Sequence, residues 1–212
     1  MGKDVLSSEY AIVACGTMRP ELEHLKEEGF LDTAKIFYTT PGLHQEPAEL
    51  ARQLDLQISR AKKFSRKIIV VYGGKFCYIN VNDPYDNIDA LISRQQEEGY
   101  AISRVQAERC FDMLVSSEER EQLAAGSRVW WLTPGWILYR HQVFKGWDKA
   151  QANENFPKHD GGAILLDGLD FFNRYSEEHP EELLDYSDWM GLPIQPHSIS
   201  LERLRFLLAK QR

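Results

Sequence analysis

Short apolar runs alternate with amphipathic segments along most of the chain. The runs have the β-branched or aromatic content of buried strands, and they cover residues 10–14, 35–38, 68–72, 100–103, 129–132 and 163–166. Apolar residues at three- and four-residue steps predict helices over residues 20–28, 47–62, 84–98, 106–114, 117–125, 136–152, 180–189 and 201–210. We therefore expect one α/β domain over residues 1–212. It would hold a doubly wound, mostly parallel sheet of five to six strands, with helices on both faces and a helical C-terminal tail.

Composition narrows the class of protein. The chain has 212 residues, of which 43% are hydrophobic, which suits a domain that needs no disulfides to hold its core. Lys and Arg number 25 against 32 Asp and Glu, and the net charge of −7 argues against a nucleic-acid or anionic-membrane partner. We find neither a secretory signal nor an apolar segment of the ~20 residues that span a membrane. We expect a cytoplasmic protein that acts on a small molecule.

The three cysteines are the main chemical feature of the sequence. An odd, small number of cysteines without a signal peptide is not a disulfide framework. Cys15 follows the first predicted strand, Cys77 follows the third, and Cys110 follows the fourth. His44 follows the second strand, after a Pro-Gly pair. Since the carboxyl ends of parallel strands meet at one edge of a sheet, we expect these four side chains on the same side.

Thiolate and neutral imidazole are the ligands that Zn²⁺ prefers. The sequence therefore predicts a metal site formed by Cys15, Cys77 and Cys110, with His44 as a candidate fourth ligand. If one of the four is not a ligand, a coordination position stays open for substrate, as in catalytic zinc sites. Iron or an iron–sulfur cluster is an alternative occupant. A second reading stays open, because free cysteine is often simply buried and no Cys-x-x-Cys pair occurs.

Other residues at the same edge are candidates for substrate contact. Arg104 could bind a substrate carboxylate or phosphate in bidentate fashion, although a surface ion pair is the default role of such a residue. Trp136 could form the wall for a flat ligand or belong to the core. Gly73 and Gly74, with Lys75 as counter-charge, could hold a phosphate, but a tight turn is the simpler interpretation. The remaining candidates offer backbone or hydroxyl contacts and are Gly16, Thr17 and Thr133.

Several of these segments resemble one known family. Residues 14–17, 41–44, 71–78, 110–114, 131–136 and 187–190 are together similar to the family catalogued as domain of unknown function 1638. Genes of that family often accompany corrinoid-dependent methyl-transfer systems, so the resemblance implies a role in one-carbon or corrinoid metabolism. The family's cysteine after the third strand usually stands closer to the glycine than Cys77 does, which makes Cys77 the least secure ligand by analogy.

We expect a zinc-binding protein of one-carbon or corrinoid metabolism. If it is an enzyme, the expected reaction is methyl transfer that activates a thiol or amine substrate, with Cys15, Cys110 and Arg104 as the catalytic residues. Two alternatives remain. One is a non-catalytic accessory protein that binds a corrinoid or docks on a corrinoid protein or methyltransferase. The other is a metal-free enzyme in which Cys15 is the nucleophile and His44 the base. The sequence does not indicate the oligomeric state.

Overall fold

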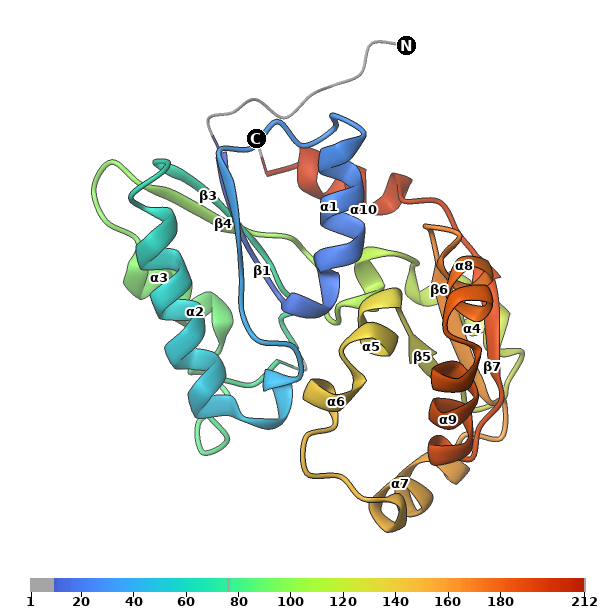
Figure 1. Cartoon of the computed structure of the whole chain (residues 1–212). Coiled ribbons are helices and arrows are strands. Elements are labelled where there is room, and N and C mark those ends of the chain that lie inside the picture. Colours follow the sequence, from blue (N-terminus) through green and yellow to red (C-terminus); the bar gives the residue numbers. More distant parts are fainter. Residues whose placement is uncertain (1–9, 76, 212) are drawn as a thin grey trace.

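Two parallel sheets form the framework of the computed structural model, which describes residues 10–75 and 77–211 (Figure 1). The first sheet has the strand order β2-β1-β3-β4 and the second has the order β5-β6-β7. The strands are β1 (Tyr10–Ala14), β2 (Lys35–Tyr38), β3 (Lys67–Val71), β4 (Ala101–Arg104), β5 (Trp130–Leu132), β6 (Ala163–Asp167) and β7 (Ile194–Ser198). The predicted α/β class and parallel strand direction are confirmed. The prediction of one sheet with five to six strands is wrong.

The break between the sheets lies between β4 and β5. A strand returns beside its predecessor when the connecting helix packs an apolar face on the sheet. Here the connecting helix is α4 (Ser117–Ala124), which is rich in charged residues and whose buried residue is Arg120. The helix α4 thus offers no broad apolar face to the first sheet, and the strand that follows it, β5, pairs with β6.

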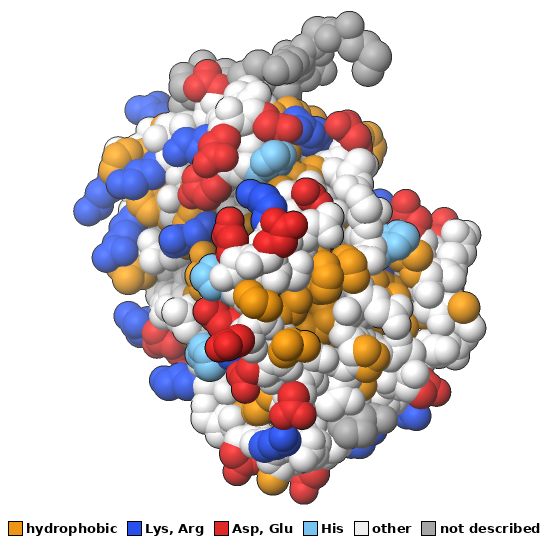
Figure 2. Space-filling model, turned by 45° about the vertical axis from the view of Figure 1, so that its right-hand side comes forward, with side chains coloured by type: hydrophobic (Ala, Val, Ile, Leu, Met, Phe, Trp, Pro, Cys, Tyr) orange, Lys and Arg blue, Asp and Glu red, His pale blue; other side chains and the backbone are white. Residues whose placement is uncertain are grey.

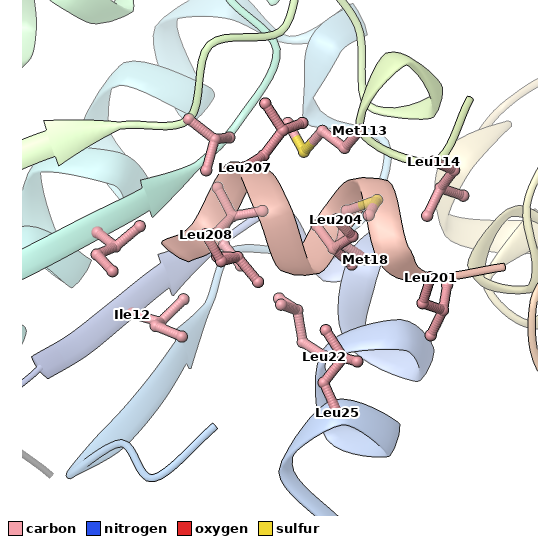
Figure 3. Close-up of a cluster of buried hydrophobic side chains, with 14 of the residues drawn as sticks. Ile12, Met18, Leu22, Leu25, Met113, Leu114, Leu201, Leu204, Leu207 and Leu208 are labelled. Carbon is pink, nitrogen blue, oxygen red and sulfur yellow. The ribbon is translucent and has the colours of Figure 1, made fainter. Parts of the chain in front are cut away.

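The first sheet is covered on both faces. The helices α2 (Pro47–Ala61) and α3 (Ile88–Gln95) bury Leu50, Leu54 and Ile88 against one face. The opposite face is covered by α1 (Arg19–Glu27) and α10 (Glu202–Ala209). Figure 3 shows α10 on this second face, with its leucines among Ile12 of β1, Leu22 and Leu25 of α1, and Met113. Around this sheet the expected doubly wound arrangement is present.

The second sheet carries the helices that sequence patterns predicted least well. The predicted helix over residues 136–152 is wrong, because the chain forms α5 (Pro134–Leu138), α6 (Arg140–Val143) and α7 (Lys149–Asn155) instead. Gly146 has a left-handed φ of 82°, which ends the helical path before α7. The helix α8 (Phe171–Glu178) and the strand β7 were not predicted, and β7 lies between α9 (Pro180–Met190) and α10. The C-terminal tail is therefore not purely helical.

One further predicted helix is absent. Residues 106–114 contain only a short 3₁₀ turn, Phe111–Met113. The Asp112 carboxylate accepts from the Arg109 backbone N–H at 2.9 Å and pairs with the buried Arg120. The backbone carbonyl oxygen of Asp112 accepts from Arg203 Nε at 2.7 Å. These contacts hold the segment as a fixed loop, which sets the position of Cys110.

The surface shown in Figure 2 mixes acidic and basic side chains around a central band of hydrophobic ones. Exposed large hydrophobic side chains of the described surface include Tyr85, Val81 and Leu184. Among the helices of the described residues, none is both long and apolar enough to cross a bilayer.

Candidate thiol site

The three cysteines lie at the carboxyl-terminal edge of the first sheet. Cys15 directly follows β1, Cys77 lies in the loop after β3, and Cys110 lies in the loop after β4. All three are partly buried and form no disulfide. Cys110 packs on the side of α1, Cys77 packs on the side of α2, and Cys15 contacts both sides. The thiols therefore line the end of the sheet from one face to the other.

The thiols influence one another electrostatically. Burial raises the pKa of Cys77, and the proximity of Cys15 and Cys110 raises it further. Burial raises the pKa of Cys110 to about 12, again with a contribution from Cys15. Burial also raises the pKa of Cys15, although hydrogen bonds from Thr17 and Tyr72 partly oppose it. All three thiols are consequently protonated at neutral pH in the metal-free chain.

Hydroxyl groups surround Cys15. Its Sγ shares a hydrogen bond of 3.1 Å with Thr17 Oγ1, from the turn that follows β1. The Tyr72 hydroxyl at the end of β3 hydrogen-bonds Thr39 and also lies near the Cys15 thiol. These groups can donate to a thiolate, so they would support the charged form once a cation is present.

The double glycine after β3 forms a tight turn against the Cys110 loop. Gly74 N–H donates to Ala107 O at 2.9 Å, and Lys75 N–H donates to Glu108 O at 3.1 Å. A methyl group added at Gly73 would lie 2.7 Å from Arg109 Cα, so only glycine permits this approach. Because the N–H groups of Gly74 and Lys75 are already bonded, this geometry favours the turn interpretation over a phosphate cradle. It also brings the Cys77 and Cys110 loops together.

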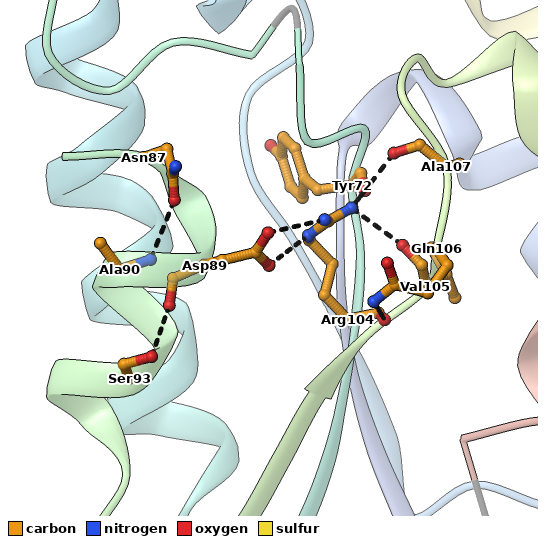
Figure 4. Close-up of polar contacts among 9 residues, drawn as sticks. All are labelled: Tyr72, Asn87, Asp89, Ala90, Ser93, Arg104, Val105, Gln106 and Ala107. Carbon is orange, nitrogen blue, oxygen red and sulfur yellow. Dashed lines mark hydrogen bonds and ion pairs between the residues drawn. The ribbon is translucent and has the colours of Figure 1, made fainter. Parts of the chain in front are cut away.

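Arg104 holds the strand ends in place (Figure 4). Its Nε and Nη2 donate to both carboxylate oxygens of Asp89, on α3, at 2.7 and 2.8 Å. Its Nη1 donates to the carbonyl oxygens of Tyr72, Val105 and Ala107. Through these contacts the guanidinium connects β4 to α3 and to the neighbouring loops. Its positive charge lowers the pKa of nearby Cys77. Arg104 is placed to position the loops and not to receive a substrate anion.

The helix α5, which follows β5 of the second sheet, packs beside the thiols. Thr133 precedes α5 and is fully buried, and its Oγ1 has no hydrogen-bond partner among the described residues. A methyl group at Gly135 would lie 1.9 Å from Thr17 O, so glycine allows α5 to touch the turn that carries Cys15 and Thr17. Trp136 Nε1 lies near Cys110 and lowers the pKa of that thiol, without a well-directed hydrogen bond.

His44 packs against Trp136. Its ring stacks on the Trp136 ring, with centroids 5.4 Å apart and an interplanar angle of 29°. Burial lowers the pKa of His44, so the ring is neutral at pH 7. The stacking contact with Trp136 holds this buried, neutral ring in place.

Glu21 is a site residue that the sequence patterns missed. It lies in the first turn of α1, is only 1% exposed, and neither carboxylate oxygen has a hydrogen-bond partner in the described chain. Burial raises its pKa to about 8, and Asp167 contributes to the rise. An acidic residue in a first helical turn is common, so its sequence position carries no warning of this burial.

The side chains are near one another but not arranged as a closed metal site. Within residues 10–75 and 77–211, no group of three or more His, Cys, Asp or Glu side chains has the geometry to hold an ion. A cation would therefore have to draw the thiols inward by side-chain rotation.

Comparison with known proteins identifies one family. The family model described as a protein of unknown function, DUF1638, matches residues 38–208. No curated protein and no solved structure matches the chain. The match includes Cys77, Cys110 and Trp136, whereas Cys15 and Glu21 precede the matched range.

Proposed function

The chain belongs to the DUF1638 family of proteins of unknown function, and we propose that it binds one divalent, thiol-preferring cation, Zn²⁺ first, through Cys15, Cys77 and Cys110. The observation that supports the proposal is the position of three partly buried thiols in three strand-end loops at one edge of the first sheet, where Cys15 influences the pKa of the other two.

The pKa directions favour a ligand role over a nucleophile role. Reactive cysteines have a lowered pKa, from a nearby cation or a helix N-terminus. Here burial and neighbouring thiols raise the pKa of all three cysteines. A cation supplies the missing positive charge and releases the thiol protons as it binds. This argues against the metal-free alternative with Cys15 as nucleophile and His44 as base.

The three cysteines have the chemistry of zinc ligands, although their side chains are not spaced as a closed metal site. Thiolate sulfur is a preferred zinc ligand, and three protein ligands leave one position open. When bound, the ion would act as a Lewis acid that keeps a substrate thiol deprotonated at neutral pH. The chain's own groups would support it: Thr17 and Tyr72 donate toward Cys15, and Arg104 keeps positive charge beside Cys77.

The resemblance noted above adds a biological context to this proposal. It suggests that the substrate belongs to one-carbon or corrinoid metabolism and that the chemistry is methyl transfer to a thiol or amine. A non-catalytic role beside a corrinoid protein or methyltransferase would use the same cation site. Steady methyl transfer by the purified chain distinguishes the two.

Elemental analysis of the full chain, purified without chelator or added metal, tests cation binding. We expect near-stoichiometric zinc in the wild type, loss of metal in C15S and C110S, and retention in E154Q, which removes an exposed carboxylate on α7. A visible spectrum of the same sample separates zinc from iron or an iron–sulfur cluster. A folded wild-type chain that holds no metal, and takes up none when zinc is added, would overturn the proposal.

A further inference from the structure

We propose that the cavity between α9 and the turn that follows α6 binds a small, neutral molecule with one flat aromatic ring. The cavity has a volume of about 210 Å³, and four aromatic side chains line it, Phe144, Trp147, Tyr186 and Trp189. None of the three cysteines lines it. The inference therefore goes beyond the proposed cation binding and does not depend on it.

The first wall of the cavity is formed by the turn after α6. Trp147 N–H donates to Phe144 O at 3.0 Å, and Gly146 within this turn has a left-handed φ of 82°. The turn brings the Phe144 and Trp147 rings together, with centroids 5.4 Å apart. Trp147 Nε1 donates to Gln45 Oε1 at 3.0 Å, which fixes the orientation of the indole. This wall is therefore formed before any ligand binds, as is usual for small-molecule sites.

The second wall is formed by α9. Tyr186 and Trp189 lie three positions apart on this helix and so share one face. Their rings stack with centroids 6.0 Å apart, and Phe144 contacts both of them. Trp147 lines the same cavity, but among the described side chains its ring contacts are with Phe144 and Phe156 and not with the α9 pair. The open space thus separates the Trp147 indole from α9, and a flat ring placed there would meet aromatic rings on both sides.

The charges at the polar end of the cavity are balanced. Arg140 Nη2 donates to Asp185 Oδ2 at 2.7 Å, and Nη1 donates to Glu182 O at 2.9 Å. The same guanidinium lies 5.4 Å from the centroid of the Tyr186 ring. A ligand anion would have to displace Asp185 from Arg140, and a ligand cation would meet the guanidinium. The lining therefore favours a neutral ligand.

The volume of the cavity sets the size of the ligand. An engineered apolar cavity of about 150 Å³ holds benzene. The cavity beside α9, at about 210 Å³, has room for one ring with a small substituent. Tyr186 is only 1% exposed, and its hydroxyl has no hydrogen-bond partner within the described residues. Since an unpaired buried hydroxyl marks a place where a water or ligand atom is expected, a substituent with one polar atom suits this wall.

Titration of the ¹⁵N-labelled full chain with benzyl alcohol and with cyclohexylmethanol tests the proposal. Both probes are neutral alcohols of similar shape, but only the first has a flat aromatic ring. We expect benzyl alcohol to bind at least ~5-fold more tightly, because stacked aromatic pairs gain more than their buried area alone provides. It should shift the indole N–H signals of Trp147 and Trp189 in NMR spectra. Trp131, which packs on the aliphatic core, should keep its signal.

Substitutions in and beside the cavity complete the test. W147L removes one aromatic wall and should abolish the preference for benzyl alcohol, whereas W147F keeps a ring and part of the preference. L184A, at an exposed position of α9 that does not line the cavity, should behave as the wild type. Equal affinity of the wild type for both probes, or shifts spread evenly over all five tryptophans, would overturn the proposal. Both of these outcomes are read from the wild-type chain, so the test holds even if W147L does not fold.

Discussion

The two sheets of this molecule are built from different kinds of core. The first sheet is filled with aliphatic side chains on both faces, such as Ile12, Val13 and Leu54. The second is packed with aromatic rings, and Phe156 lies at their centre, edge-on to Trp130 at 5.0 Å. All three thiols lie at the end of the first sheet, whereas a cavity of about 210 Å³ lies among the aromatic residues near α9.

This difference suggests a division of roles. Parallel strands buried on both faces form a rigid base, and the loops at their carboxyl ends present the chemistry. The aromatic region covers one side of that chemistry through Thr133, Gly135 and Trp136. The adjacent tryptophans of β5 join the two regions, because Trp130 packs in the aromatic core and Trp131 packs on the aliphatic one.

The largest expected loss of stability comes from a substitution in the aromatic core. Phe156→Ala removes a fully buried ring that contacts Trp130, Phe144 and Trp189, and we expect the free energy of unfolding to fall by ~3–5 kcal/mol. Chemical denaturation followed by circular dichroism measures it. Phe206→Ala, at an exposed position of α10, is the control and should change stability by less than ~0.5 kcal/mol. A similar loss in both variants would contradict the central role of the aromatic cluster.

The next largest effect concerns the contact between the two regions, where α5 touches the turn after β1. Gly135→Ala places a methyl group 1.9 Å from Thr17 O and must push α5 away from the Cys15 turn. We expect a loss of ~1–3 kcal/mol in the free energy of unfolding and faster alkylation of Cys15. Leu138→Ala, near the end of the same helix and more exposed, is the matched control. Wild-type stability and Cys15 reactivity in Gly135→Ala would show that the contact is not tight.

The alkylation rates of the three cysteines test the burial of the thiols at the end of the first sheet. Because burial raises the pKa of all three cysteines, alkylation by iodoacetamide at neutral pH should be slow in the folded, chelator-treated chain. We expect Cys77 and Cys110 to react at least ~10-fold more slowly than in the unfolded chain, since one unit of pKa changes the thiolate fraction tenfold, and Cys15 to react more slowly as well. Peptide mapping assigns each site. One cysteine that reacts as fast as a free thiol would support the metal-free nucleophile instead.

The smallest effect concerns His44. Burial lowers its pKa, so the unfolded chain binds more protons than the folded chain around and below the ordinary histidine value of about 6.5. The free energy of unfolding should therefore fall as the pH drops through that range, and less so in H44Q. Titration of the ring signals by NMR gives the pKa directly. A value at or above the ordinary one would contradict the buried, stacked position.

The sequence predicted the first sheet better than the second for identifiable reasons. The strand β1 is an uninterrupted apolar run and β3 contains four successive β-branched residues, and their positions follow from these patterns. The strand β7 was missed because Pro196 and its exposed neighbours do not resemble a strand, although an edge position tolerates proline. The division into two sheets depends on a polar connecting helix, which strand patterns alone do not reveal.

The candidate site was predictable in part. The rule that strand ends share one edge brought the three cysteines together in the prediction, and the structure places them at that edge. The structural role of Arg104 was not readable, because its partner Asp89 lies on α3 and its other partners are backbone carbonyls. Glu21 was missed because its burial arises only when α1 packs beside α5 and the Cys110 loop.

X-ray absorption at the zinc edge of the zinc-loaded full chain tests the central claim most directly. The account predicts three sulfur neighbours at ~2.3 Å and one lighter neighbour at ~2.0–2.2 Å, which are the usual zinc–thiolate and zinc–oxygen distances. One sulfur neighbour should be lost in C110S. A zinc ion surrounded only by nitrogen and oxygen, or by a single sulfur, would contradict the three-thiol site.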